Sequence, residues 1–353
     1  MRSAIIFLFL TAAFCIPAFA QEKPLTQAEY VQLLYKLERR TATKEDVVDA
    51  LRQRGIGFAL TDGVRGLTRS KGANDDELKR ALEEAERRRK DPEGTKIPTQ
   101  LEVAGIIDKT RRKTLEAVEE MPDFVVKQQI QRSASFAGTG TFRPQDKLVV
   151  AVSYRSTGEE SYKLLSINGA LQATPEAKGS YDEAGGTSST GEFVTMLATI
   201  FKPESDADFT PVQTDIVRGR TAVIFDFTVE RDKAKQRIVS GSGVGTQQTI
   251  TGMKGRIWID RADYRVLRVE SDATEIPEGF PVTGARRTID YDWTTISDEK
   301  YLLPLVSDVR LTIREGGRSF ETRNLIRFTN YQKFGTDIII GPEDSGPVVE
   351  EKP

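Results

Sequence analysis

Strict alternation of apolar and polar side chains dominates the chain from residue 124 to residue 331. Between residues 221 and 231, Val223, Phe225 and Phe227 fall on one side of the run, and Asp226 and Thr228 fall on the other. The side chains of a β-strand point alternately to its two faces, so this period indicates strands that bury one face only. Short turns join the runs, which predicts a large antiparallel meander.

Several segments carry this pattern or the β-branched and aromatic composition of strands. They are residues 124–131, 147–155, 161–167, 221–231, 255–260, 264–271, 287–294, 303–313 and 319–331. A sheet of about eight or more strands tends to curl or close on itself. The predicted fold class is therefore α+β: a large curved antiparallel sheet, or half-open β-barrel, with covering helices, preceded by a small all-helical domain.

Two helical segments can cover the apolar face of this sheet. The first spans residues 100–120 and has an apolar stripe that includes Ile107 and Leu115. The second spans residues 191–201, and its apolar face consists of Phe193, Met196, Leu197, Ile200 and Phe201. Glycine, serine and threonine are concentrated just before it, in residues 179–191, which predicts a flexible loop. Such a loop would let the second helix act as a movable lid.

The N-terminus has the order of a cleavable secretion signal. Arg2 supplies a positive charge, residues 4–16 are almost entirely apolar, and Ala18-Phe19-Ala20 is a small-x-small cleavage site. The apolar run is shorter than the roughly 20 residues that a transmembrane helix needs. We therefore expect residues 1–20 to be removed and the mature chain to begin at Gln21, in the periplasm.

Cys15 lies inside the apolar run, but Phe14 precedes it where a lipoprotein signal needs a small residue, so the pattern argues against a lipid anchor. Cys15 is also the only cysteine, and the chain contains no histidine. A mature chain without either residue excludes disulfides, zinc sites built from cysteine and histidine, and catalysis by a thiol or an imidazole base. The formal net charge of −2 gives no sign of nucleic-acid binding, which usually requires a basic domain.

Composition divides the rest of the chain into four parts. Residues 21–90 form a helical module, residues 91–98 a linker with two prolines and a glycine, residues 99–340 the curved-sheet domain, and residues 341–353 a disordered tail. The basic run at residues 87–90 fits the C-terminus of a helix, where positive charge is favoured, better than it fits a binding patch.

Three short motifs follow one another in the helical module. They are Arg54-Gly55-Ile56-Gly57-Phe58, then Leu60-Thr61, then Gly72-Ala73-Asn74-Asp75-Asp76-Glu77-Leu78. This pattern resembles a short helical module that recurs, often fused to other domains, in proteins of Acidobacteria and similar bacteria. The resemblance covers residues 47–88. It implies no catalytic role and favours an interaction or spacer role.

The sheet domain carries a second resemblance. A helix leads directly into a strand rich in glutamine and arginine at residues 124–132, and the hairpin at residues 255–270 contains Trp258-Ile259-Asp260 before its turn. Together these features resemble the LolA/LolB-like half-barrels of outer-membrane lipoprotein sorting, a group that includes the sensor domain of RseB-type regulators. The resemblance, over residues 101–340, implies a periplasmic protein whose concave apolar cavity holds acyl chains or an apolar peptide segment, without catalysis.

Signals for catalysis are better explained by turns and solvated strand faces. The run at residues 297–300 matches S-x-x-K but lies in a polar turn rather than at a helix start. The glycine-rich run at residues 241–245 lacks the strand-to-helix context of a phosphate-binding loop. Acidic pairs are expected on the surface of a chain in which 29% of the residues are charged; they are Asp206/Asp208, Asp260/Asp263 and Asp290/Asp292.

These observations predict an exported, non-enzymatic protein that binds an apolar ligand, such as a lipid, an acyl chain or a lipoprotein anchor, in a concave cavity. No cofactor, metal ion or nucleic acid is expected. The predicted ligand contacts are Phe193, Met196, Leu197, Ile200, Phe201, Val223, Phe225, Phe227, Ile257 and Ile259. The alternative is an envelope interaction protein whose β core is filled by its own side chains and whose helical module docks onto a protein partner; a hydrolase is the third hypothesis.

Overall fold

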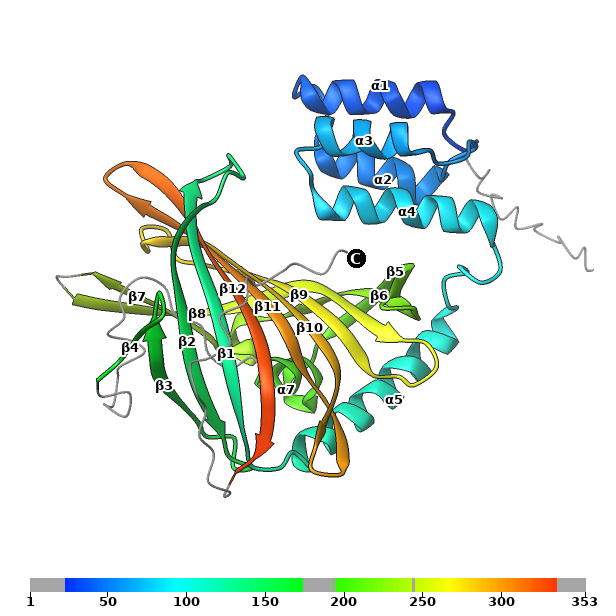
Figure 1. Cartoon of the computed structure of the whole chain (residues 1–353). Coiled ribbons are helices and arrows are strands. Elements are labelled where there is room, and N and C mark those ends of the chain that lie inside the picture. The colour runs from blue at the N-terminus through cyan, green and yellow to red at the C-terminus, as the bar shows by residue number, and fades with distance from the viewer. Residues whose placement is uncertain (1–22, 174–192, 194, 243–244, 335–353) are drawn as a thin grey trace, which may run out of the picture. The chain divides into compact units, whose positions relative to one another are not determined.

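The computed structural model describes residues 23–173, 193, 195–242 and 245–334. The chain divides into two compact units, residues 1–92 and residues 93–353. The first unit is helical and the second contains all of the described strands (Figure 1). No helix in these described ranges is long and apolar enough to cross a membrane.

The helical unit consists of four capped helices. They are α1 (Gln27–Glu38), α2 (Lys44–Arg54), α3 (Asp62–Lys71) and α4 (Asp76–Lys90). Thr26, Thr43, Thr61 and Asp75 each accept a hydrogen bond from a backbone N–H of the first turn, which satisfies a donor that the helix itself cannot use. The apolar stripes of the helices meet in one core, which includes Tyr30, Leu34, Val47, Leu51, Leu78 and Leu82.

The basic run at the end of α4 is used inside this unit. Arg88 donates from its two Nη atoms to the carbonyl oxygens of Leu51 and Arg52, each at 2.7 Å, and so closes the C-terminal end of α2. Its neighbours Arg87 and Arg89 pair with buried glutamates one turn earlier on α4. These contacts give the run a structural role within the helical unit.

The second unit contains one large antiparallel sheet. Its strands are β1 (Phe124–Phe136), β2 (Arg143–Tyr154), β3 (Glu160–Ile167), β4 (Ala170–Leu171), β5 (Asp208–Val217), β6 (Arg220–Val229), β7 (Gln236–Ser242), β8 (Gly245–Asp260), β9 (Val266–Thr274), β10 (Val282–Ile296), β11 (Glu299–Glu315) and β12 (Arg318–Lys333). They pair in the order β4-β3-β2-β1-β12-β11-β10-β9-β8-β6-β5, and β7 pairs with β8. The two ends of this series do not pair, so the sheet is open.

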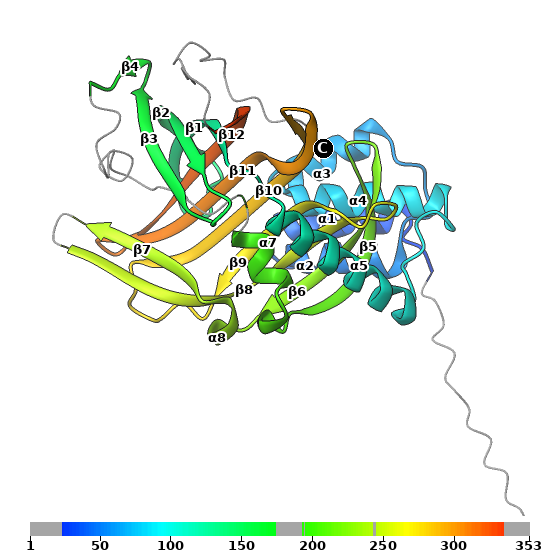
Figure 2. The ribbon, with the colours of Figure 1, turned by 90° about the horizontal axis from the view of Figure 1, so that it is seen from below.

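The predicted α+β class, with a curved open antiparallel sheet and covering helices, is confirmed (Figures 1 and 2). Most strands are longer than predicted, and β4, β5 and β7 were not predicted. Close approach of neighbouring strands contributes to the shape: a Cβ added at Gly255 would lie 1.9 Å from the carbonyl oxygen of Glu270. Only glycine fits at that position of β8.

Helices cover part of one face of the sheet, which we call the inner face. They are α5 (Gln100–Glu119), the short α7 (Thr195–Phe201) and the one-turn α8 (Arg231–Ala234), with the 3₁₀ turn η1 (Pro203–Ser205) after α7. Figure 2 shows the sheet curling around α7 and α5. Residues 191, 192 and 194 of the predicted second helix, and the predicted loop at residues 179–191, lie outside the described residues.

Two core clusters lie on the inner face. The first joins α5 and α7 to strands β6, β8, β9 and β10. The second joins Phe193 to strands β1, β2, β3, β11 and β12. Phe193 packs edge-to-face against Phe124 and Phe328, with ring centroids 5.3 and 5.5 Å away. The two clusters make up the buried floor of the inner face.

Candidate functional site

The strand register orders the inner face into rows that run across the sheet. Residues directly opposite each other on neighbouring strands point to the same face. The central row consists of Ile130 (β1), Ile326 (β12), Ser307 (β11), Ile289 (β10), Val269 (β9), Ile257 (β8) and Phe225 (β6). All seven are buried, and all but Ser307 belong to the two core clusters. This row belongs to the floor of the inner face.

The structure brings the sequence-predicted ligand residues together on this floor. Val223, Phe225, Phe227, Ile257 and Ile259 project from the inner face into the first core cluster, where they meet Met196, Leu197, Ile200 and Phe201 of α7. Phe193 belongs to the second cluster instead. Every one of the ten side chains is at least 93% buried. They therefore contact protein side chains, and their contact with a ligand stays a prediction.

A polar band crosses the inner face one row beyond the central row. Its members, in strand order, are Asp146 (β2), Arg132 (β1), Asn324 (β12), Arg287 (β10) and Ser271 (β9), with Val309 of β11 between Asn324 and Arg287. Arg132 makes a two-pronged ion pair with Asp146: Nε lies 2.6 Å from Oδ1 and Nη2 lies 2.5 Å from Oδ2. These two parallel hydrogen bonds fix the orientation of the guanidinium relative to the carboxylate.

A half-exposed apolar shelf follows the polar band. Its next row contains Ala134 (β1), Thr322 (β12), Leu311 (β11) and Ala285 (β10), and beyond it lie Phe320 (β12) and Ile313 (β11). Each of these six side chains is partly exposed, in contrast to the fully buried floor. Alanines lie at the two ends of the row, with the larger Thr322 and Leu311 between them. The shelf is thus an apolar surface on the same face as the core, with hydrogen-bonding groups along one side.

Sequence reasoning missed the band and the shelf. Within single strands, the band consists of polar residues at positions whose neighbours two places away are buried and apolar: Arg132 beside Ile130, Ser271 beside Val269, Asn324 beside Ile326. Each such interruption is common by itself. Only the strand register shows that these polar residues fall in one row. A sequence signal for the band would have been a polar residue at the matching inward-facing position of several successive strands.

Gln128 adds a polar group to the floor itself. It lies between Val126 and Ile130 on the inner face of β1, opposite Val150 and Phe328, and is completely buried. Neither amide atom has a hydrogen-bond partner among the described residues. Ser307, in the central row, is also fully buried, and its hydroxyl likewise has no partner there. A buried amide without partners costs about 1–3 kcal/mol.

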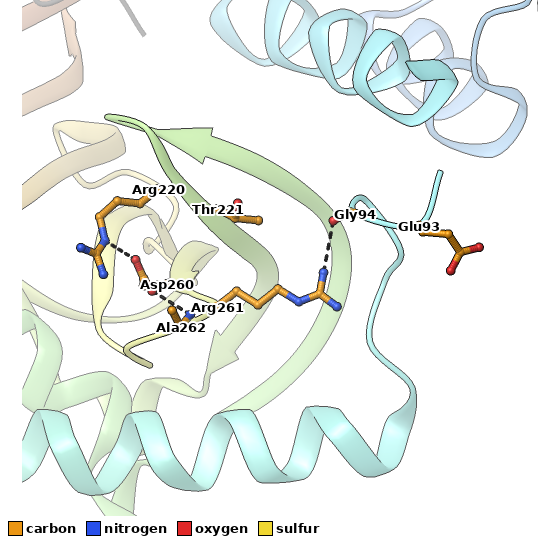
Figure 3. A pocket seen from close by; sticks show the side chains of 7 residues that line it. All are labelled: Glu93, Gly94, Arg220, Thr221, Asp260, Arg261 and Ala262. Carbon is orange, nitrogen blue, oxygen red and sulfur yellow. Dashed lines mark hydrogen bonds and ion pairs between the residues drawn. The ribbon is translucent and has the colours of Figure 1, made fainter. Parts of the chain in front are cut away.

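A separate, polar pocket lies beside the β8–β9 hairpin. It has a volume of about 580 Å³ and is lined by Glu93, Gly94, Arg220, Thr221, Asp260, Arg261 and Ala262 (Figure 3). Arg220 forms ion pairs with Asp260 and Asp263. Arg261 donates to the carbonyl oxygens of Gly94 and Lys96, at 3.3 and 3.4 Å. Arg220, Asp260 and Arg261 of this pocket are therefore already engaged in contacts within the protein.

Asp260 organises this hairpin. Its Oδ1 accepts hydrogen bonds from the backbone N–H groups of Ala262 and Asp263, both at 2.8 Å, which fixes the turn after Trp258 and Ile259. Burial alone would raise the pKa of Asp260, but the hydrogen bonds from Arg220 and from these two N–H groups outweigh it and hold the pKa below its ordinary value. The ionised carboxylate of Asp260 therefore stabilises the turn.

The other motifs weighed for catalysis also have structural explanations. Ser297, in the S-x-x-K match, lies in the β10–β11 turn with a positive φ of 57°. Asp290 pairs with Arg268 at 2.7 Å. The glycine-rich run belongs to the β7–β8 hairpin, and residues 243–244 lie outside the described residues. Within the described ranges, no group of three or more Asp, Glu, Cys or His side chains could hold a metal ion.

We expect Asp260→Asn to lower the free energy of unfolding at pH 7 by about 1–3 kcal/mol, because charge-assisted hydrogen bonds are lost. The ionised carboxylate stabilises the fold above the ordinary aspartate pKa of about 3.9, and this contribution disappears as the pH falls through the lowered folded-state pKa. Denaturant unfolding from pH 7 to pH 3 should show the variant losing less stability than the wild type. Asp263→Asn, at a half-exposed carboxylate, is the control; an equal effect there would contradict the assignment.

Gln128→Leu should raise the free energy of unfolding by about 1–3 kcal/mol, because it removes two unpartnered polar atoms from an apolar core. Thermal and urea unfolding measure this change. Gln131→Leu, on the opposite face of the same strand, serves as the matched control and should change stability little. A destabilised Gln128→Leu variant would mean that the Gln128 amide has a partner, such as a bound water or ligand, and that the fold is stabilised by this contact.

No protein-family model matches this chain, and no curated protein matches it. Among solved structures, the chain is similar to a DUF1329 family protein from Desulfovibrio piger, with 11% identity and a TM-score of 0.30, over 68% of this chain and 95% of that one. It is also similar to the Pseudomonas aeruginosa MucA/MucB complex structure, with 10% identity and a TM-score of 0.18, over 63% of this chain and 94% of that one. A second structure of MucB in complex with MucA gives 10% identity and a TM-score of 0.17. Similarity at these scores does not indicate a function.

Proposed function

We propose that this is an exported, non-catalytic protein that holds an apolar ligand, such as an acyl chain, on the apolar shelf of the inner face. The observation that carries the proposal is the shelf itself: six partly exposed side chains continue the inner face beyond the buried core. Apolar surface left in contact with water on an otherwise buried face commonly marks a binding site. The periplasmic location rests on the secretion signal in residues 1–20.

The shelf suits a hydrocarbon chain better than a peptide. At the shelf, β11 and β12 each pair with a neighbour on both sides, so their backbone N–H and C=O groups are used within the sheet. A peptide lying across them would bring backbone polar groups to an apolar surface without partners, which is costly. A hydrocarbon chain has no such groups and gains from contact with the shelf alone.

The polar band supplies hydrogen-bonding and charged groups for the polar end of such a ligand. It runs beside the shelf from β2 to β9, a span of about 24 Å at the usual strand spacing. Ser271 has a hydroxyl with no hydrogen-bond partner among the described residues, and Arg287 is a partly exposed cation in the same row. An acyl chain with an ester, amide or carboxylate end could therefore place its apolar part on the shelf and its polar end on the band.

A second candidate function is the interaction protein of the sequence analysis. The observation that favours it is the close packing of the ten predicted ligand residues, which leaves the helix-covered floor filled by protein. In that case the shelf would be covered by a protein partner rather than by a lipid. Probe binding separates the two hypotheses, because a shelf that recognises hydrocarbon should take up a free fatty acid.

Leu311→Asp should weaken the binding of a fluorescent fatty-acid probe about tenfold or more, because a charge would face the hydrocarbon chain. The fold should survive, since Leu311 is only partly buried. Thr312→Asp, one residue along β11 and on the opposite face, is the matched control and should bind like the wild type. No uptake by the wild type, or equal loss in both variants, would exclude binding on the shelf.

Phe193→Ala tests whether the α7 region is a lid or a part of the core. Phe193 is 98% buried among aromatic rings, so we expect the variant to lose about 3–5 kcal/mol of unfolding free energy. A movable lid would instead keep its stability and lose probe binding. Urea unfolding and probe titration, performed on the same preparation, show which of the two quantities changes.

A further inference from the structure

Two hairpin ends lie side by side at one end of the sheet. The β1–β2 connection covers residues 137–142, and the β11–β12 turn is formed by Gly316 and Gly317. Phe136 and Phe320 are opposite each other in the register of β1 and β12, and their rings pack with centroids 5.4 Å apart. Figure 1 shows both hairpins reaching the same end of the sheet. We call residues 136–143 and 314–320 the aromatic tip.

The aromatic tip exposes apolar side chains. Phe136 is 57% exposed, one of the most exposed large hydrophobic residues in the described chain. The loop that follows it, residues 137–142, contains no charged residue and ends in Phe142. Phe142 is held in place from the sheet side, because the guanidinium carbons of Arg310 and Arg323 lie 5.6 and 5.8 Å from its ring centroid. The tip therefore combines an uncharged loop with three aromatic rings.

Three basic residues lie around these rings. Arg143, Arg314 and Arg318 are exposed, and no carboxylate of the described residues forms an ion pair with them. Five other arginines of the sheet each pair with an aspartate: Arg132, Arg268, Arg286, Arg310 and Arg323. Within the tip, Glu315 is the only acidic residue, so positive charge predominates.

We propose that the aromatic tip docks on the surface of an anionic lipid bilayer. Aromatic side chains are favoured at the boundary between headgroups and hydrocarbon, where an uncharged loop can also enter. Arginines around the rings would meet the negative headgroups, and each basic residue near such a surface strengthens binding about fivefold. The proposal does not depend on ligand binding at the shelf.

Sedimentation with vesicles tests this proposal on the purified exported protein. We expect binding to phosphatidylglycerol/phosphatidylcholine vesicles that weakens in high salt, and much weaker binding to phosphatidylcholine alone. Arg143→Gln with Arg318→Gln should weaken binding to anionic vesicles roughly 25-fold, from about fivefold per arginine. Phe136→Ser should weaken binding about tenfold, through lost apolar contact.

Trp293→Ser and Lys300→Gln are the matched controls. Trp293 is 39% exposed and Lys300 is exposed, and both lie near the β10–β11 turn, at the other end of these strands. Neither change should affect vesicle binding, and circular dichroism should show that all variants are folded. Equal binding to neutral and anionic vesicles, wild-type binding by the double arginine variant, or no vesicle binding at all would overturn the proposal. Such results would leave the fatty-acid test at the shelf unaffected.

Discussion

The inner face of the sheet is longer than the helices that cover it, and much of the structure follows from this mismatch. Strands β10, β11 and β12 contain 15, 17 and 16 residues, or about 50 to 58 Å of extended chain. The seven residues of α7 extend over only about 10 Å. Buried residues of this face are therefore concentrated on the floor and in part of the polar band, where Arg132, Asn324 and Ser271 are buried. From the floor towards the end of the strands, the inner face is first polar, in the band, and then apolar and partly exposed, on the shelf.

The outer face of the sheet meets a different constraint, because its strands carry many charges. Aspartates there are shared between arginines of neighbouring strands or of the same strand: Asp308 accepts from both Arg310 and Arg323. Burial would raise the pKa of Asp308, and the two guanidinium groups outweigh this effect and lower it. Arg268 lies over the ring of Trp258, 5.7 Å from its centroid, while it pairs with Asp290. Such ion pairs compensate the charges on the outer face, so this face of the curved sheet can remain in contact with solvent.

Alternation in the sequence was enough to predict the sheet, its antiparallel pairing and the face that carries Val223, Phe225 and Ile257. The reason is that the apolar and polar residues of each strand show which side chains share a face. Rows across the sheet could not be predicted, since a shift of one residue between strands moves every side chain to the other face. The bulges in β10 and β12 pairing are such shifts. Phe193 shows the same limit: its helical spacing to Met196 suggested one shared face, yet the two residues belong to different core clusters.

The shelf and the aromatic tip share Phe320, so the two proposals concern one continuous surface. Along β12, the inner face passes from buried Phe328 and Ile326 through Asn324 of the band to Thr322 and then to Phe320 at the tip. The polar band thus separates the apolar shelf from the core. Among the residues that the structure describes, no such band lies between the shelf and the tip at the end of the sheet. If the tip lies against a bilayer, a hydrocarbon chain could pass between the membrane and the shelf without crossing water, whose contact with each methylene costs about 0.8 kcal/mol. An arrangement in which the band faced the tip would lack this property.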